Sequence, residues 1–224
     1  MELREVTFLA VILRIFVAVL VGGMIGLERE MKSRAAGLRT YILVCVGACL
    51  IMLTNQYIYQ VFKTGDPVRM GAQVISGIGF LGAGTIIVTK RNRIKGLTTA
   101  AGLWSTAGLG LALGIGFYEA AFTGAFAILP VITLMQKMDD KMKKNSDRVE
   151  IFVEISREYS LGDFLRSLKA LDMDAGNFQR ERDSETQSEV RAYTVTLKLT
   201  KRRQHVEVIE EIMKIPGVEY LEEL

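Results

Sequence analysis

Residues 73–106, QVISGIGFLGAGTIIVTKRNRIKGLTTAAGLWST, decide the fold of this chain. They form two glycine-rich apolar runs joined by a short basic loop at residues 90–95. No Asp or Glu lies between Pro67 and Tyr118. Glycine weakens a helix in water, but in a bilayer it lets two helices approach closely and pack. The stretch therefore predicts two membrane helices and a basic turn.

Four glycines of this stretch, Gly77, Gly79, Gly82 and Gly84, contain the pattern G-x-G-x-x-G of dinucleotide-binding proteins. That site requires a strand before the pattern, a helix after it and an acidic residue about 20 positions later. Here the acidic residue is absent, and the apolar run continues to Val88. We therefore interpret the four glycines as helix-packing positions.

Composition changes sharply within the 224 residues. Residues 1–148 carry 17 Lys and Arg against 9 Asp and Glu, with 18 of the 21 glycines. Residues 149–224 carry 11 basic against 16 acidic residues. This change predicts a basic membrane domain followed by an acidic soluble domain.

Five apolar segments have about the 20 residues that a membrane helix needs. They are residues 6–27, 37–62, 70–88, 96–116 and 117–135. Gly22 and Gly26 form a Gly-xxx-Gly pair in the first segment, typical of helix contacts. Small residues recur every four positions in the fourth segment. We expect Gly102, Gly110 and Gly114 to line one packing face there.

Basic residues predict the orientation of these segments. They concentrate after the first, third and fifth segments, at Arg29, Lys32, Arg34, Arg39, Lys90, Arg91, Arg93, Lys95, Lys137, Lys141, Lys143, Lys144 and Arg148. The opposite side has only Arg4, Lys63 and Arg69. By the positive-inside rule, the N-terminus lies outside and the C-terminal domain is cytoplasmic.

The periodicity of the acidic part differs from that of the spans. The apolar residues of VEIFVEI alternate as in a strand, and those of LGDFLRSLKAL repeat at helical spacing. Two further predicted strands flank the polar turn at 183–189, and a predicted helix and a last strand follow. This order, βαββαβ, predicts a ferredoxin-like α+β domain. The expected domains are 1–136 in the membrane, a linker at 137–147 and 148–224 in the cytoplasm.

Residues for metal or enzyme chemistry are sparse. Cys45 and Cys49 are four positions apart, but the one histidine, His205, belongs to the other domain. A metal site needs more ligands than two cysteines, so we interpret them as small packing residues. No nucleophile with a base and no paired carboxylates emerge. We expect no enzymatic activity, no cofactor and no nucleic-acid partner.

Charged residues near the membrane boundary have two interpretations. Glu28, Arg29 and Arg39 lie where the first two spans meet the cytoplasm. They are either solvated anchors, with Glu28 pairing Lys32 at i,i+4, or a shared polar site in which Glu28 reaches Arg39. Arg14 lies deeper, and a buried charge is a functional hypothesis unless it snorkels to the outer surface.

Polar uncharged residues occur within the spans themselves. They are Gln73, Ser76, Thr85, Thr98, Thr99, Ser105 and Thr106. Such side chains either form hydrogen bonds between helices or line an ion path, and we favour the hydrogen bonds.

Four motifs resemble the MgtC/SapB family of bacterial membrane proteins. They are GLERE at 26–30, AGLRT at 36–40, QVISGIGFLGAGTI at 73–86 and KGLTTAAGLWSTAGLGLALGIG at 95–116. Glu28, Arg29, Arg39, Thr40, Gln73, Thr98 and Thr99 belong to these motifs and form the candidate polar site. The C-terminal domain resembles the ACT-like domain of many members.

The resemblance implies a multi-pass protein of the bacterial inner membrane. Relatives support growth at low magnesium and survival inside macrophages, and one restrains the F-type ATP synthase. We expect a regulator that contacts lipid and other membrane proteins, with a cytoplasmic domain that senses a small ligand or pairs with its copy. The alternative is a small transporter or channel. Transporters usually place carboxylates along their path, and the third and fourth spans have none.

Overall fold

The computed structural model describes residues 5–89, 94–144, 146–180, 190–200 and 203–224. Most of the basic loop and the polar turn at 183–189 lie outside the described residues. The chain divides into two compact units, Met1–Gln136 and Lys137–Leu224.

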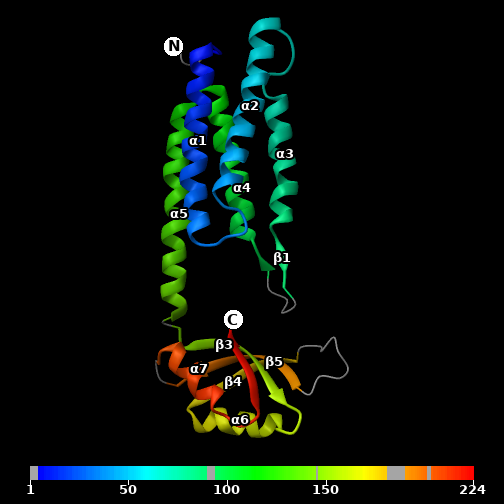
Figure 1. Ribbon diagram of the computed structural model, residues 1–224, viewed down its shortest axis with the longest axis vertical. Helices are drawn as coiled ribbons and strands as arrows, with labels where there is room; N and C mark the ends of the chain where they lie inside the picture. The colour runs from blue at the N-terminus through cyan, green and yellow to red at the C-terminus, as the bar shows by residue number, and fades with distance from the viewer. Residues whose placement is uncertain (1–4, 90–93, 145, 181–189, 201–202) are drawn as a thin grey trace. The chain divides into compact units, whose positions relative to one another are not determined.

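Long helices build the first unit (Figure 1). They are α1 (Phe8–Met31), α2 (Leu38–Phe62), α3 (Arg69–Gly84), α4 (Leu97–Ile115) and α5 (Tyr118–Lys144). Within the described residues, three helices are long and apolar enough to cross a membrane: α1, α2 and the part of α5 at Tyr118–Met135. The protein is therefore a helical membrane protein with a C-terminal extension.

The predicted third span, 70–88, is wrong at its C-terminal end. Helix α3 has 16 residues and stops at Gly84, where the Thr85 hydroxyl donates to the carbonyl of Gly82 at 2.8 Å. The β-branched residues that follow favour extended backbone. They form β1 (Ile87–Val88), which pairs antiparallel with β2 (Ile94–Lys95). Helix α4 keeps the predicted bounds, but its many small residues leave it outside the three candidate spans.

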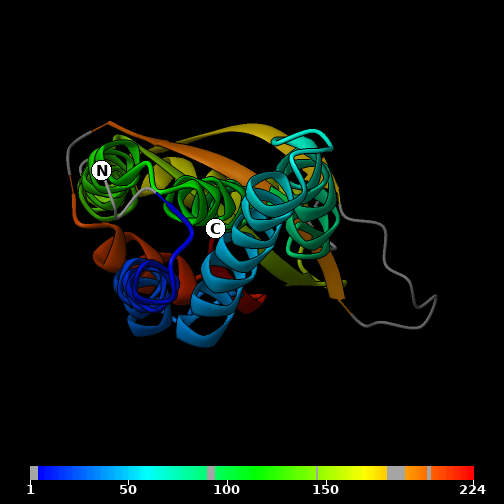
Figure 2. The ribbon, with the colours of Figure 1, turned by 90° about the horizontal axis from the view of Figure 1, so that it is seen from above.

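Helix α2 packs between α1 and α4, and glycines make both contacts close (Figure 2). A Cβ at Gly22 would lie 2.8 Å from the carbonyl oxygen of Tyr41, and one at Gly26 would lie 2.8 Å from Cα of Leu38. From the other side, a Cβ at Gly114 would lie 2.6 Å from the carbonyl oxygen of Cys49. Any side chain at these positions would push the backbones apart.

The second unit has the predicted order βαββαβ. Its elements are β3 (Arg148–Ser156), α6 (Leu161–Ala170), β4 (Met173–Arg180), β5 (Val190–Leu199), α7 (His205–Met213) and β6 (Val218–Glu223). The strands form one antiparallel sheet in the order β4-β5-β3-β6. The predicted linker at 137–147 is largely helical, because α5 extends to Lys144.

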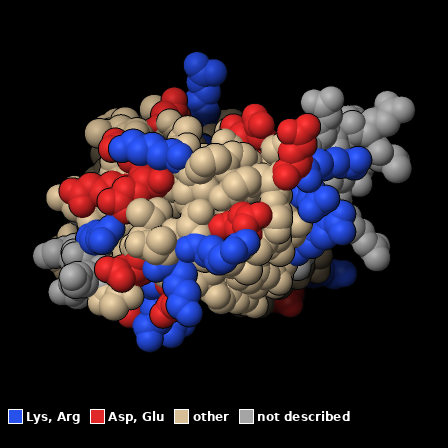
Figure 3. All heavy atoms as spheres, turned by 90° about the horizontal axis from the view of Figure 1, so that it is seen from below, with Lys and Arg blue, Asp and Glu red and all other residues tan. Residues whose placement is uncertain are grey.

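Alternation along β3 creates the core of this unit. Val149, Ile151, Val153 and Ile155 are buried, and they share a cluster with the apolar faces of α6 and α7. Val153 lies opposite both Tyr193 on β5 and Leu221 on β6. On the face drawn in Figure 3, acidic and basic side chains are interspersed among uncharged ones.

Candidate functional site

A buried arginine joins three helices at one end of the first unit. Arg29, in the last turn of α1, is 2% exposed, and its Nη2 donates to the hydroxyl of Thr99 at 3.2 Å. The Tyr41 hydroxyl, from the first turn of α2, donates to the backbone carbonyl of Thr99 at 3.4 Å. Thr99 lies in the first turn of α4. The two bonds tie α1 and α2 to the beginning of α4.

Glu28 contributes the negative charge of this cluster. Its carboxylate lies 3.9 Å from Nη1 of Arg29 and 2.8 Å from Nζ of Lys32, the predicted i,i+4 pair. The Glu28 side chain is 14% exposed, and Nε of Arg29 has no hydrogen-bond partner within the described residues. Burying a charged group whose hydrogen bonds are only partly made costs free energy. In a membrane protein, such a group usually marks a functional or structural site.

Glycines create the space for the cluster. Gly26 lets α2 approach α1, and a Cβ at Gly102 would collide with the Tyr41 hydroxyl. The glycines and the polar residues therefore form one arrangement, in which close backbone approach brings Tyr41 and Arg29 to Thr99.

The predicted contact between Glu28 and Arg39 is wrong. Arg39 is exposed and forms no ion pair with Glu28 in the described part of the chain. Glu28 is already held by two cations of its own helix. Glu30 reaches α2 instead, because its Oε2 accepts the backbone N–H of Leu38 at 2.7 Å. Thr98 is exposed, although its neighbour in the same motif, Thr99, is buried.

Arg14 is fully buried and serves the other end of α4. Its Nη1 donates to the carbonyl of Gly114 at 2.7 Å, and Nη2 donates to the carbonyl of Glu5 at 3.3 Å. Its Nε lies 3.4 Å from the Tyr118 hydroxyl. The last carbonyls of a helix lack partners within the helix, so Arg14 satisfies one of them. Snorkelling to the surface, one of the two expectations, is wrong for this residue.

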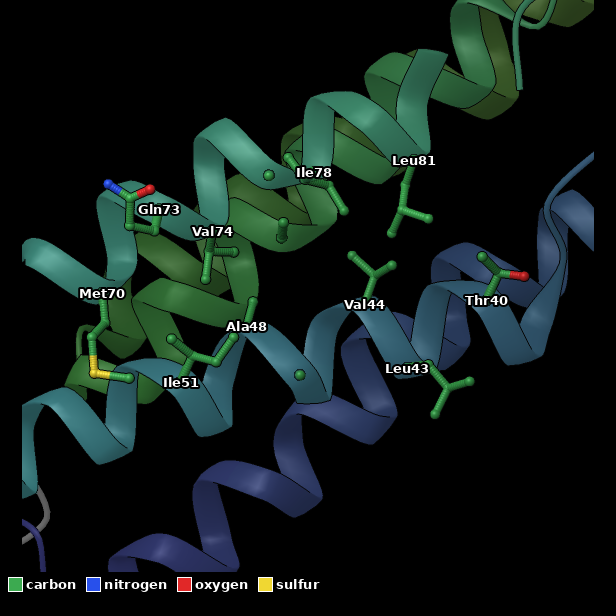
Figure 4. Close-up of a pocket in the computed structure, with 13 residues that line it drawn as sticks. Thr40, Leu43, Val44, Ala48, Ile51, Met70, Gln73, Val74, Ile78 and Leu81 are labelled. Carbon is green, nitrogen blue, oxygen red and sulfur yellow. The ribbon is translucent and has the colours of Figure 1, made fainter. Parts of the chain in front are cut away.

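An apolar groove lies between α2 and α3, with Ala107 of α4 also contributing to its lining (Figure 4). Its volume is about 740 Å³. Thr40 and Gln73 are its only polar lining residues in the described chain, and Figure 4 draws them near opposite ends. Of the candidate polar residues, Glu28, Arg29 and Thr99 thus belong to the buried cluster, Thr40 and Gln73 line this groove, and Arg39 and Thr98 belong to neither.

The glycines of α3 differ from those of α1 and α4. A Cβ at Gly82 would make ordinary contact with Ala100 at 3.5 Å, but Gly77, Gly79 and Gly84 have open space within 4 Å. Among the described residues, these three glycines do not pack against another helix of this chain, so their role in helix packing stays a prediction. Gly47 of α2, which lines the groove with Gly77, has open space as well.

Sequence reasoning missed Tyr41 and Glu30. Tyr41 precedes Cys45 and Cys49 at intervals of four, so this spacing could have placed it on the same buried face. The two cysteines are buried and free, and the glycines of α4 pack on them. No cluster of three or more His, Cys, Asp or Glu able to hold a metal occurs among the described residues.

Comparison with known proteins identifies the family. The sequence profile of the MgtC family matches residues 15–141, more than half of the chain. The chain belongs to the MgtC family. Protein SapB of Bacillus subtilis is 32% identical over 220 residues, covering 93% of this chain and 92% of SapB. No solved structure matches the chain.

Two further relatives match smaller parts of the chain. The putative magnesium transporter YhiD of Escherichia coli K12 is 34% identical over 179 residues, covering 78% of this chain and 82% of YhiD. Protein MgtC of Salmonella typhimurium LT2 is 38% identical over 144 residues, covering 64% of this chain and 60% of that protein. The profile match includes the buried cluster and the groove, whereas the SapB match extends over most of the second unit as well.

Proposed function

We propose that this MgtC-family protein is a non-enzymatic membrane regulator that receives a transmembrane helix of a partner protein in the groove between α2 and α3. The observation that carries the proposal is the pair of open glycines, Gly47 and Gly77, on the two walls of the groove. At Gly22 and Gly114, by contrast, a neighbouring helix occupies the space beside the glycine.

The dimensions and chemistry of the groove favour a helix over lipid. Its α2 wall extends from Thr40 to Ile51, about 17 Å at the rise of an α-helix. That length corresponds to about three helical turns. Gln73 is exposed on the apolar wall, and an unpaired amide facing hydrocarbon would cost free energy. A partner helix with a polar side chain would satisfy the Gln73 amide, which acyl chains cannot do.

The topology we propose has five spans in the bacterial inner membrane, with the N-terminus outside and the C-terminal unit in the cytoplasm. Helix α4 is not among the three candidate spans, but many of its residues are buried by other helices, which supports counting it as a span. Helix α3 is about 24 Å long, and we propose that the β1–β2 hairpin completes the crossing on the cytoplasmic side. Lys95, at the end of that hairpin, agrees with the positive-inside rule.

We propose that the second unit is an ACT-like, ferredoxin-like domain. Two helices and the antiparallel order β4-β5-β3-β6 support this assignment. Its roles would be to sense a small ligand or to pair with its copy. The family resemblance suggests growth at low magnesium as the process served and the F-type ATP synthase as a partner. Transport is the less supported function, because the described lining of the groove has no charged residue.

Leucine at the open glycines tests the proposal. Gly47→Leu and Gly77→Leu each place a side chain in the groove. At both positions, no other described atom of the chain lies within 4 Å of the new Cβ. Each should leave the protein level unchanged and abolish complementation of growth at low magnesium. Gly108→Leu is the matched control, because Gly108 also has open space but lies outside the groove.

The partner itself is detected by photo-crosslinking from position 73. A crosslinker that replaces Gln73 should capture a membrane protein in the native membrane, and Gly77→Leu should abolish that product. The proposal is wrong if both leucine variants complement normally at normal protein level, or if the crosslinker captures only lipid.

A further inference from the structure

His205, the one histidine of the chain, is held between two hydrogen-bond acceptors in the second unit. It begins α7, and its side chain is 9% exposed. Its Nδ1 lies 2.6 Å from Oε1 of Glu223, on β6. Its Nε2 lies 3.1 Å from the backbone carbonyl of Ser146, two residues before the first residue of β3. One ring thus joins the beginning of α7 to the last strand and to the segment that enters the sheet.

The chemistry of the two partners fixes the protonation of this ring. A backbone carbonyl only accepts, and so does an ionised carboxylate. A neutral imidazole carries one N–H, so it satisfies one partner and turns a lone pair toward the other. Imidazolium carries two N–H groups, so it satisfies both partners. The protonated ring is therefore the form that satisfies both partners in this geometry.

Electrostatics agree with the geometry. Burial by itself lowers the pKa of His205, but the hydrogen bonds to Ser146 and Glu223 and the charge of the carboxylate outweigh burial, so the pKa is raised above its ordinary value. Glu223 is the one charged group of the described chain that acts on the ring.

Other charged residues on the neighbouring segments are paired with each other or exposed. Before α7, Arg203 pairs with Glu211 at 2.8 Å, and Glu207 in the first turn of α7 is exposed. Before and at the beginning of β3, Asp147 and Arg148 are exposed. The titration of the ring is thus governed by its own two bonds.

We propose that His205 is a protonation-controlled clamp on the segment through which the chain enters the second unit. In the protonated state the ring holds Ser146 against α7. When the Nε2 proton leaves to solvent, the remaining N–H keeps the short bond to Glu223, and the Ser146 carbonyl loses its donor. The Ser146 carbonyl is then no longer tied to α7, while the next residue, Asp147, stays bonded through its carbonyl to the N–H of Leu199. Proton concentration would in this way control how firmly Ser146 is held within the second unit.

The direction of the pH dependence follows from linkage. The folded-state pKa is above the unfolded value, so the stabilisation is fully present below the ordinary histidine pKa of about 6.5. It is lost as the pH rises through the raised folded-state pKa.

The test uses the full chain in lipid nanodiscs, purified through a tag that lacks histidine. After selective ¹⁵N labelling of histidine, NMR observes the two ring nitrogens of His205 alone. We expect both ring nitrogens to be protonated at pH 6, with a midpoint above 6.5. Hydrogen exchange at residues 141–150 should be slower in the wild type than in His205→Gln at pH 6. The two proteins should be equal well above the midpoint.

Two variants keep the test decisive. Glu223→Gln removes the charge but keeps an acceptor, so the midpoint should fall by about one pH unit or more. Glu211→Gln breaks the neighbouring ion pair and should leave the midpoint unchanged. An ordinary midpoint in the wild type, or a midpoint that is the same in Glu223→Gln, would overturn the clamp. The variants lie outside the groove, so their outcome is independent of the proposed partner helix.

Discussion

Nη2 of Arg29 donates to the hydroxyl of Thr99 at 3.2 Å, across 70 positions of the sequence. This bond fastens the last turn of α1 to the first turn of α4, with both residues buried. It explains why an arginine next to the exposed end of an apolar helix does not extend into solvent.

Replacing Arg29 should destabilise the bundle. Arg29→Gln removes the cation beside Glu28 and should cost about 3 kcal/mol, as when one partner of a buried charge pair is lost. Arg39→Gln is the control and should cost close to zero, because Arg39 is exposed. The stability of both variants is measured by thermal unfolding in the same detergent, as the fraction of protein that remains monodisperse at each temperature. Equal behaviour of the two variants would show that Arg29 is a boundary anchor.

Leucine at the packed glycines should reduce the amount of folded protein. At Gly110 or Gly114, the added side chain would meet the backbone of α2, so the helices must separate. Gly79→Leu serves as a comparison, because a side chain there meets nothing within 4 Å. Size-exclusion chromatography of a fluorescent fusion reports the folded yield. Normal yields for the Gly110 and Gly114 variants would contradict the close contact of α4 with α2.

Replacing Arg14 should destabilise the protein, because a buried backbone carbonyl would lose its hydrogen-bond donor. Arg14→Met keeps most of the side-chain volume but leaves the carbonyl of Gly114 without its donor, at a cost of about 1–3 kcal/mol for a buried acceptor. Arg14→Lys should recover part of this stability, because an ammonium group can still donate. If methionine is as stable as arginine in the unfolding assay, the bond to Gly114 contributes nothing.

The orientation of the chain can be tested at its C-terminus. A reporter that works only in the cytoplasm, fused after Leu224, should be active, because basic residues dominate the loops on that side. A periplasm-only reporter at the same position should be silent. The reverse pattern would invert the proposed topology.

Several features could be predicted from local sequence. Strand alternation predicted the order βαββαβ, and the four-residue spacing of glycines predicted the face of α4 that packs on α2. Those signals are local, because they depend on the period of the element itself. The C-terminal end of α3 could not be predicted, because the apolar run of Ile86, Ile87 and Val88 has no periodicity that separates helix from strand.

The contacts of the polar cluster could not be derived in the same way. Glu28 and Arg39 are oppositely charged and belong to neighbouring motifs, yet the side chain that reaches α2 comes from Glu30. Helical rotation decides this, since positions 28 and 30 point in directions about 200° apart at 3.6 residues per turn. Which of them faces α2 depends on how α1 packs, which one sequence does not specify.

The unequal placement of the glycines has a consequence for motion. Helices α1, α2 and α4 interlock through positions where a single methyl group would collide, so relative sliding among them requires their backbones to separate first. Helix α3 has open space at Gly77, Gly79 and Gly84, and Phe80 is 85% exposed, whereas Leu81 lines the groove. Helices α1, α2 and α4 therefore pack closely with one another, and α3 packs less closely at these three glycines. An opening or closing of the groove would displace α3 while the buried bonds of Arg14 and Arg29 stay intact.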